Sequence, residues 1–173
     1  INFSGMKLFP QEIEEVLKGV LPLGYPVFCS YPNFDPGNIA IRSVIDATKT
    51  KYANLIAYHN LSRDVFVALY KRCAAILGNS SSIVIEAGFL KKPGILIGPR
   101  QNLREVGSNV VRVAATATAV RKTALSALRD KSFLAKVKKC ESLYGDGHSA
   151  ERIAAILKRV KLDAGLLRKT MIY

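Results

Sequence analysis

The sequence has few of the residues that bind metals or form disulfides: two histidines and three cysteines. His59 and His148 have no second ligand at a metal-binding spacing, so we expect no metal site. Cys29, Cys73 and Cys140 are odd in number and include no C-x-x-C pair. We expect reduced, mostly buried thiols, which favour a reducing compartment and therefore a cytoplasmic location.

Long apolar runs are also missing. No stretch approaches the ~20 apolar residues that a membrane-spanning helix needs. The first residues, INFSGMKLFPQE, lack the basic and apolar segments of a signal peptide. We therefore expect no membrane segment. A chain of 173 residues is long enough for one domain, and because it opens on Ile1 we expect a fragment of a longer protein.

Acidic residues are scarce beside basic ones: 13 Asp and Glu against 26 Lys and Arg give a net charge of +13. The excess is explained either by solvated helix faces or by an anionic partner, such as nucleic acid, an acidic membrane surface or a phosphorylated small molecule. The basic residues are not interleaved with aromatic ones, and no helix-turn-helix, RNP or zinc pattern is present. Nucleic acid is therefore the least favoured partner.

Short apolar runs rich in β-branched residues recur along the chain, at 26–31, 54–59, 73–78, 94–98 and 109–113, with a possible sixth at 1–3. Their continuous hydrophobicity is typical of strands that are covered on both faces. Helical patterns lie between them, at 10–20, 37–51 and 61–72. Pro10 indicates the start of the first helix, and Ser62 is a candidate N-cap of the third.

The alternation of strands and helices predicts an α/β fold: a Rossmann-like parallel sheet with helices on both faces. From about residue 115 to residue 173 the pattern is helical, so we expect a single domain over 1–173 with a helical C-terminal tail. In such a fold, ligands bind at the carboxyl ends of the strands.

The stretch LGNSSSIVIEAG places a serine-rich turn, Gly78 to Ser82, between a predicted strand and a predicted helix. The first turn of a helix offers unpaired N–H groups and partial positive charge, which suit a phosphate. Ser82 and Glu86 are four residues apart and share one helix face, so the carboxylate can accept from ribose hydroxyls while the serines hold a diphosphate. An ordinary N-cap serine beside surface residues explains the same spacing. The G-x-G-x-x-G and Walker patterns are absent, and we expect no cofactor.

Four sequence blocks occur along the chain in the order YPNFDPG, GNSSSIVIEAGFLKKPGILIGPRQNLRE, NVVRV and YGDGHSAERI. In this order they resemble the nucleotide-binding half of UDP-N-acetylglucosamine 2-epimerases, hydrolysing branch. The resemblance implies the C-terminal half of a two-domain GT-B architecture, whose N-terminal catalytic domain is absent from this sequence. From its residues alone, Asp146 in the YGDG block predicts an Asx-type turn.

The resemblance also implies roles for single residues. Ser80 and Ser81 match serines that bind the β-phosphate of UDP, and Glu86 matches a glutamate that binds the ribose hydroxyls. Arg100 matches an arginine at the diphosphate end, and His59 matches a position near the uracil. Without the resemblance, Arg100 is interpreted as a surface arginine after a strand and His59 as an edge histidine.

The implied reaction converts UDP-N-acetylglucosamine and water to N-acetylmannosamine and UDP. UDP is eliminated across the sugar C1–C2 bond, and water then adds with inversion at C2. The elimination needs a base at C2 and stabilisation of the departing diphosphate. Ser80, Ser81 and Arg100 would serve the second need, and the ligand would be UDP or a UDP-N-acetylhexosamine.

Two positions depart from the family pattern. Ser4 stands where the family has a catalytic histidine, and a serine is not a base near neutral pH without help. Ile83 stands where the family usually has glycine, which predicts a tighter phosphate turn.

Three hypotheses follow. The chain is an epimerase half that is incomplete alone and is completed by a separate N-terminal domain chain or by a homo-oligomer. Alternatively, it is the nucleotide-binding half of a glycosyltransferase, or a non-catalytic module for an anionic partner. Competition by UDP supports the first two, and steep salt dependence supports the third.

Overall fold

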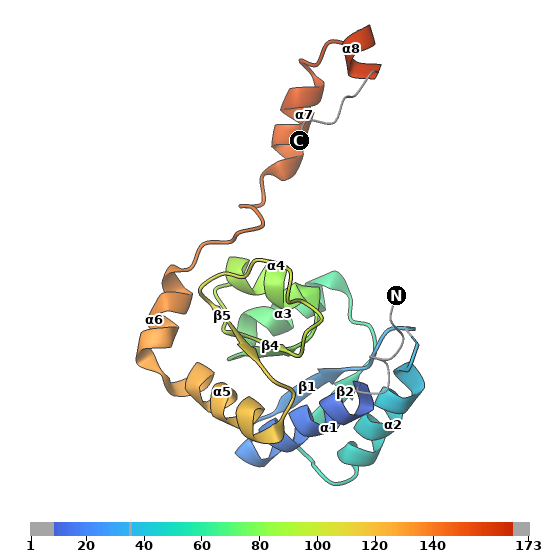
Figure 1. Ribbon diagram of the computed structural model, residues 1–173, viewed down its shortest axis with the longest axis vertical. Helices are drawn as coiled ribbons and strands as arrows, with labels where there is room; N and C mark the ends of the chain where they lie inside the picture. The colour runs from blue at the N-terminus through green and yellow to red at the C-terminus, as the bar shows by residue number, and fades with distance from the viewer. Residues whose placement is uncertain (1–8, 35, 168–173) are drawn as a thin grey trace. The chain divides into compact units, whose positions relative to one another are not determined.

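The computed structural model describes residues 9–34 and 36–167 (Figure 1). Ser4 and the possible strand at 1–3 lie outside the described residues. The helices are α1 (Phe9–Val20), the 3-10 helix η2 (Leu21–Leu23), α2 (Asn38–Lys49), α3 (Arg63–Arg72), α4 (Ser81–Phe89), α5 (Ala117–Arg129), α6 (Lys131–Lys139), α7 (Ser149–Leu157) and α8 (Ala164–Leu167). The strands are β1 (Val27–Ser30), β2 (Leu55–Tyr58), β3 (Ile76–Gly78), β4 (Gly94–Ile97) and β5 (Val110–Val113).

The strands pair in parallel throughout. β1 pairs with β2 from Val27↔Leu55 onward, and β4 lies between β3 and β5 in a second sheet. All five strands fall inside the ranges that the apolar runs predicted, and the α/β class with parallel strands is confirmed. The described strands form two sheets where the sequence predicted one. Every residue of β4 is buried, as its unbroken apolar run GILI requires.

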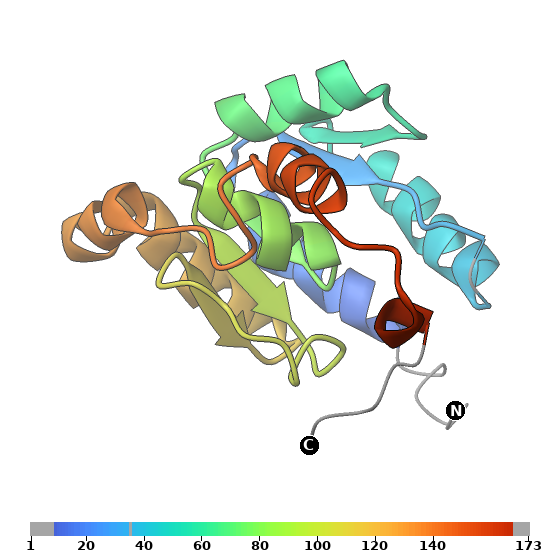
Figure 2. The ribbon, with the colours of Figure 1, turned by 90° about the horizontal axis from the view of Figure 1, so that it is seen from above.

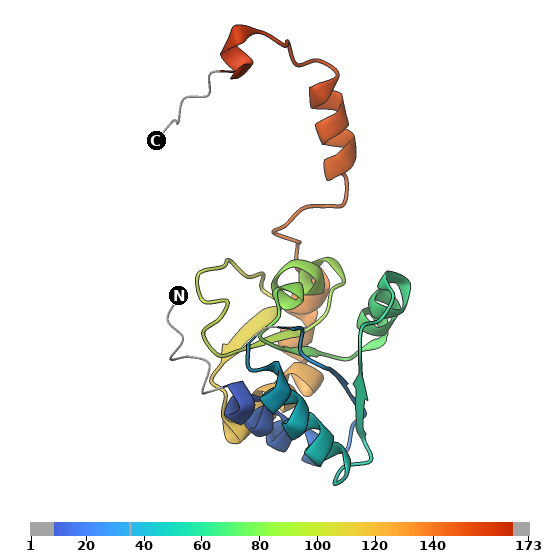
Figure 3. The same ribbon diagram turned by 90° about the vertical axis from the view of Figure 1, so that its right-hand side faces the viewer.

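Helices cover both faces of the strands (Figure 3). On one face, α1, α2 and α5 share a core with β2 and β4, in which Leu17, Ile45, Leu55, Ile95 and Val120 are buried. On the other face, α3 and α4 lie side by side and pack residues such as Ile83 and Ala87 against the second sheet (Figures 1 and 2). One core thus spans strands of both sheets and places the carboxyl ends of β3 and β4 beside the start of α4.

Two glycines allow helices to approach their neighbours closely. A Cβ at Gly19 of α1 would lie 2.9 Å from the carbonyl oxygen of Ala117 in α5. Next to this contact, the Glu15 carboxylate accepts a hydrogen bond from the Ala117 N–H at 2.9 Å. A Cβ at Gly94 of β4 would lie 2.9 Å from Cγ2 of Ile83 in α4. Glycine at position 94 therefore lets α4 sit directly on the sheet.

The chain divides into two units after Leu143. In the second unit, the Asp146 carboxylate accepts from the His148 N–H at 3.1 Å, which confirms the Asx-type turn, and it forms a two-point ion pair with Arg152. The apolar side chains of α7 and the residues after it are largely exposed; they include Ile153, Ile156, Leu157 and Val160. No helix within the described ranges has both the length and the hydrophobicity to cross a membrane.

Candidate functional site

The serine turn joins β3 to α4 as the sequence predicted. β3 ends at Gly78, whose φ of 142° favours glycine, and α4 begins at Ser81. Ser80 is the N-cap, and its hydroxyl accepts from the Ser82 N–H at 3.3 Å. The turn therefore lies at the carboxyl end of a parallel strand, where the N-terminal N–H groups of a nine-residue helix face outward from the sheet.

The three serines differ in what their hydroxyls contact. The Ser82 hydroxyl lies 2.7 Å from the Tyr70 hydroxyl of α3 and 3.0 Å from Ser80 Oγ, so it ties α4 to α3. Burial raises the pKa of Tyr70, which keeps its hydroxyl protonated. The Ser81 hydroxyl makes no hydrogen bond to another described residue. Ser80 is exposed, and Ser81 and Ser82 are half-buried.

Glu86 lies one turn further into α4, and its side chain is 24% exposed. The guanidinium of Arg63, the first residue of α3, donates to Glu86 Oε1 at 2.8 Å. Sequence reasoning missed Arg63. Its place in the sequence could have indicated a role, because Arg63 is the first residue of the helix after β2 and so lies near the carboxyl edge of the strands.

The loop after β4 is fastened to the serine turn. Gln101 is buried, and its Nε2 donates to the Asn79 carbonyl at 3.1 Å. Arg112 of β5 donates to the Gln101 carbonyl at 2.9 Å and to the Arg104 carbonyl at 2.6 Å. Arg100, the predicted diphosphate ligand, is exposed and directly precedes Gln101. The buried amide of Gln101 thus fixes the segment that carries Arg100 beside the turn that carries Ser80.

His59 follows β2 and stacks on Tyr31, which follows β1; the ring centroids are 4.5 Å apart. Arg42 of α2 lies over the Tyr31 ring, with Cζ 5.4 Å from the ring centroid. The Tyr31 hydroxyl donates to Asp46, and this bond raises the pKa of Tyr31. The structure therefore places His59 in an aromatic stack at the carboxyl edge of the first sheet, and Ser80, Ser82 and Glu86 on α4 at the second.

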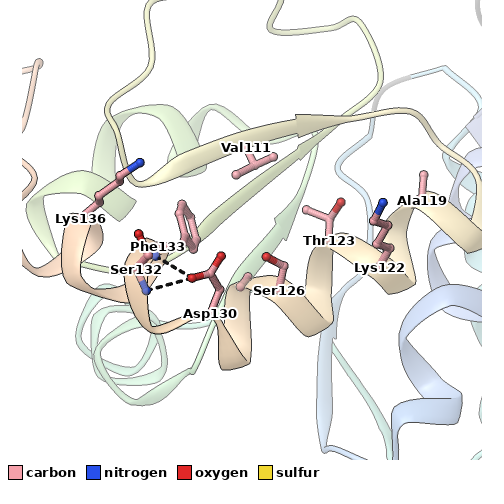
Figure 4. Close-up of a pocket in the computed structure, with 10 residues that line it drawn as sticks. Val111, Ala119, Lys122, Thr123, Ser126, Asp130, Ser132, Phe133 and Lys136 are labelled. Carbon is pink, nitrogen blue, oxygen red and sulfur yellow. Dashed lines mark hydrogen bonds between the residues drawn. The ribbon is translucent and has the colours of Figure 1, made fainter.

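The described surface has hollows next to α3 and next to α5. One, of about 460 Å³, lies between β5, α5 and α6 (Figure 4). Its walls carry Lys122 and Lys136, and the Asp130 carboxylate there is used in capping α6. None of the predicted site residues lines it. The other, of about 550 Å³, follows α3 and is lined by Arg63, Asp64, Val67, Ala68, Lys71 and Arg72. Within the described part of the chain, no three His, Cys, Asp or Glu side chains gather as metal ligands would.

Residues 9–158 match the sequence model of the family described as UDP-N-acetylglucosamine 2-epimerase. The chain belongs to this family. The resemblance inferred from the four sequence blocks is thereby confirmed at the level of the family, and the match includes the serine turn, Glu86 and the Gln101 loop. The Asp146 turn also lies within the matched range.

Two relatives in the epimerase family show how much of such a protein this chain represents. UDP-N,N'-diacetylbacillosamine 2-epimerase (hydrolyzing) of Legionella pneumophila is 32% identical over 162 residues, which are 94% of this chain and 41% of that protein. UDP-N-acetylglucosamine 2-epimerase of Neisseria meningitidis is 29% identical over 104 residues, which are 60% of this chain and 27% of that protein. The chain spans less than half the length of either relative.

Solved structures carry the same fold. A candidate UDP-N-acetylglucosamine 2-epimerase from Listeria monocytogenes superposes with a TM-score of 0.69 at 18% identity, covering 88% of this chain and 42% of the other. S. aureus MnaA, solved with UDP, superposes with a TM-score of 0.66 at 20% identity, covering 87% of this chain and 41% of the MnaA chain. At these identities the likeness establishes the fold of the epimerase-family chain.

Proposed function

We propose that this chain is the UDP-binding part of a hydrolysing UDP-N-acetylglucosamine 2-epimerase, with UDP or a UDP-N-acetylhexosamine as its ligand. The observation that carries the proposal is the start of α4: Ser80 and Ser81 lie at the helix N-terminus, at the carboxyl end of β3, and Glu86 lies one turn further on. The family match favours this reading over a glycosyltransferase half.

The diphosphate would sit on the N-terminus of α4. Phosphate oxygens accept hydrogen bonds, and this helix end supplies N–H groups, the hydroxyls of Ser80 and Ser81 and a partial positive charge. Arg100 would add a guanidinium, which can bond two oxygens at once. Ser82 would contribute its N–H or support α3, since its hydroxyl already contacts Tyr70. The fold shared with MnaA, which was solved with UDP, supports UDP as the ligand.

The nucleoside would extend from the diphosphate along α4. The Glu86 carboxylate accepts hydrogen bonds and would take them from the two ribose hydroxyls. The stacked rings of His59 and Tyr31 offer a flat surface of the kind that nucleobases contact. The proposal therefore assigns His59 to the uracil end and Glu86 to the ribose.

In the proposed reaction, a base removes the proton at C2 of the sugar while the C1–O bond breaks. The bonding electrons leave with UDP, and a C1–C2 double bond remains. Water then supplies hydroxyl to C1 and a proton to the opposite face of C2, which gives N-acetylmannosamine. The residues of this chain would stabilise the departing diphosphate; the base is not among Ser80, Ser81, Glu86 and Arg100.

Full activity would require the remainder of an epimerase, because this chain covers 41% of the Legionella relative. The rest of the site would come from the part of an epimerase that this sequence does not include. Free thiols at Cys29, Cys73 and Cys140 agree with a cytoplasmic enzyme.

The test is calorimetric titration with UDP at two salt concentrations, using wild type and Glu86→Gln. We expect the variant to bind at least ~10-fold more weakly, because hydrogen bonds to a charged group contribute about 1.5–3 kcal/mol each. Glu14→Gln is the matched control, since Glu14 is an exposed carboxylate on α1 that pairs with Lys18. It should bind as wild type does.

Absence of UDP binding by wild type would refute independent UDP binding by this chain. Binding that ignores Glu86 but falls steeply with salt would instead support a module for anionic partners. Binding that depends on Glu86 and changes little with salt would support a UDP site at the start of α4.

A further inference from the structure

The ion pair between Arg63 and Glu86 joins two helices at the proposed ribose site. The residues are 23 positions apart, on α3 and α4, and their polar atoms lie 2.8 Å from each other. The Arg63 side chain is 73% exposed, whereas that of Glu86 is 24% exposed. A largely exposed arginine therefore contacts a largely covered carboxylate.

The pair uses one oxygen of the carboxylate. Arg63 Nη1 donates to Oε1, and no other described residue forms an ion pair or a hydrogen bond with the Glu86 carboxylate. A carboxylate has about four lone-pair sites on its two oxygens. Two ribose hydroxyls can therefore donate to Glu86 while the bond from Arg63 remains.

The charge at this point also matters for a diphosphate ligand. An unpaired carboxylate close to a nucleoside diphosphate would repel the phosphates, since both are negative. Arg63 offsets that charge, and the remaining N–H groups of its guanidinium stay available to solvent or ligand. Arg72, at the other end of α3, has the same charge but no ion pair with a described residue.

We propose that Arg63 is a positioning residue, which holds the Glu86 carboxylate in the orientation that accepts the ribose hydroxyls and offsets its charge against the diphosphate. This inference rests on the proposed function, because it requires the nucleotide to bind at Glu86. Arg63 acts through Glu86, so its contribution disappears when the carboxylate is removed.

The experiment is a double-mutant cycle measured by calorimetry with UDP. The variants are Arg63→Gln, Glu86→Gln and the combination of both, with Arg63→Lys as the conservative variant and Arg72→Gln as the control. We expect Arg63→Gln to weaken UDP binding by roughly 5- to 20-fold and to change the affinity of the Glu86→Gln background less than 2-fold. Arg63→Lys should recover part of the loss, and Arg72→Gln should stay within about 2-fold of wild type.

Titration with uridine distinguishes the two proposed effects of Arg63, which are to orient the Glu86 carboxylate and to offset its charge against the diphosphate. Uridine has the ribose but no phosphates, so the loss on Arg63→Gln should be smaller for uridine than for UDP. Urea unfolding of each variant checks that the fold is unchanged, as the exposure of Arg63 leads us to expect.

The outcomes distinguish this inference from the proposed function. No binding of UDP by wild type overturns both. Binding that depends on Glu86 with an unchanged Arg63→Gln variant overturns the inference alone, as do losses that simply add in the double variant. Tighter binding by Arg63→Gln also overturns it, because Arg63 would then block the carboxylate.

Discussion

Gly94 of β4 has no room for a side chain. A Cβ there would lie 2.9 Å from Cγ2 of Ile83 and 3.0 Å from Cγ2 of Val110. Ile83 is 1% exposed and packs in the core between α4 and the sheet, so it cannot turn away without leaving a gap. Gly94→Ala therefore forces α4 and β4 apart by a few tenths of an ångström.

Two effects of opposite sign set the size of the change. Overpacking a well-packed core costs about 1–3 kcal/mol. Replacing glycine inside a strand with alanine returns about 0.5–1 kcal/mol, because the unfolded chain loses freedom. The overpacking is the larger effect, so we expect Gly94→Ala to lower the free energy of unfolding by roughly 1–2 kcal/mol.

Urea unfolding of Gly94→Ala, Ile83→Ala and the double variant tests the cause. Ile83→Ala alone should cost about 2–5 kcal/mol, because it leaves a cavity. In the double variant the new methyl group fills part of that cavity, so the combined loss should be about 1 kcal/mol or more below the sum. Losses that add within about 0.5 kcal/mol would refute the steric explanation.

Gly88→Ala is the matched control for this substitution. Gly88 is buried on α4, but a Cβ there would meet its nearest neighbour, Asn109 Oδ1, at 3.4 Å, an ordinary contact. Alanine is favoured over glycine in a helix by about 1 kcal/mol. Gly88→Ala should therefore be neutral or stabilising.

Two further predictions concern helix starts. Asp130 caps α6 by accepting from the Ser132 and Phe133 N–H groups at 2.9 and 3.1 Å. Asp130→Ala should lower the free energy of unfolding by about 1 kcal/mol in urea, and Asp130→Asn much less; equal losses would contradict the cap. In the second unit, hydrogen bonding to Arg152 lowers the pKa of Asp146 to about 2. This pKa lies below the ordinary value of 3.8, so the ion pair stabilises the folded state above pH 3.8. The stabilisation is lost as the pH falls through about 2. NMR titration of the carboxyl group should give a midpoint near 2 in wild type and a higher one in Arg152→Gln; equal midpoints would exclude Arg152 as the cause.

Local patterns predicted the elements well. The run GILI at 94–97 and the turn before Ser81 follow from hydrophobicity and helix-start chemistry, both of which depend on neighbours in sequence. Ser62 does precede α3, as predicted, although its side chain makes no capping hydrogen bond. The boundaries needed no knowledge of the tertiary fold.

Contacts between elements could not be predicted in this way. The bond of Ser82 to Tyr70 and that of Arg63 to Glu86 depend on how α3 lies against α4 and on side-chain conformation. Ile83 illustrates the same limit. From sequence it predicted a tighter phosphate turn, whereas the structure shows its side chain buried over Gly94. The assignments to UDP remain predictions for all six residues: Ser80, Ser81, Ser82, Glu86, Arg100 and His59.

The contact of α1 with α5 has a consequence for protein synthesis. Glu15 and Ala117 are 102 positions apart, and the apolar face of α1 is buried partly by α5. At about 5–20 residues per second, a ribosome makes α5 roughly 5–20 s after α1. During that interval Leu17 and Val20 lack part of their cover. We expect nascent chains stalled before Ala117 to recruit chaperones, and those that include α5 to release them.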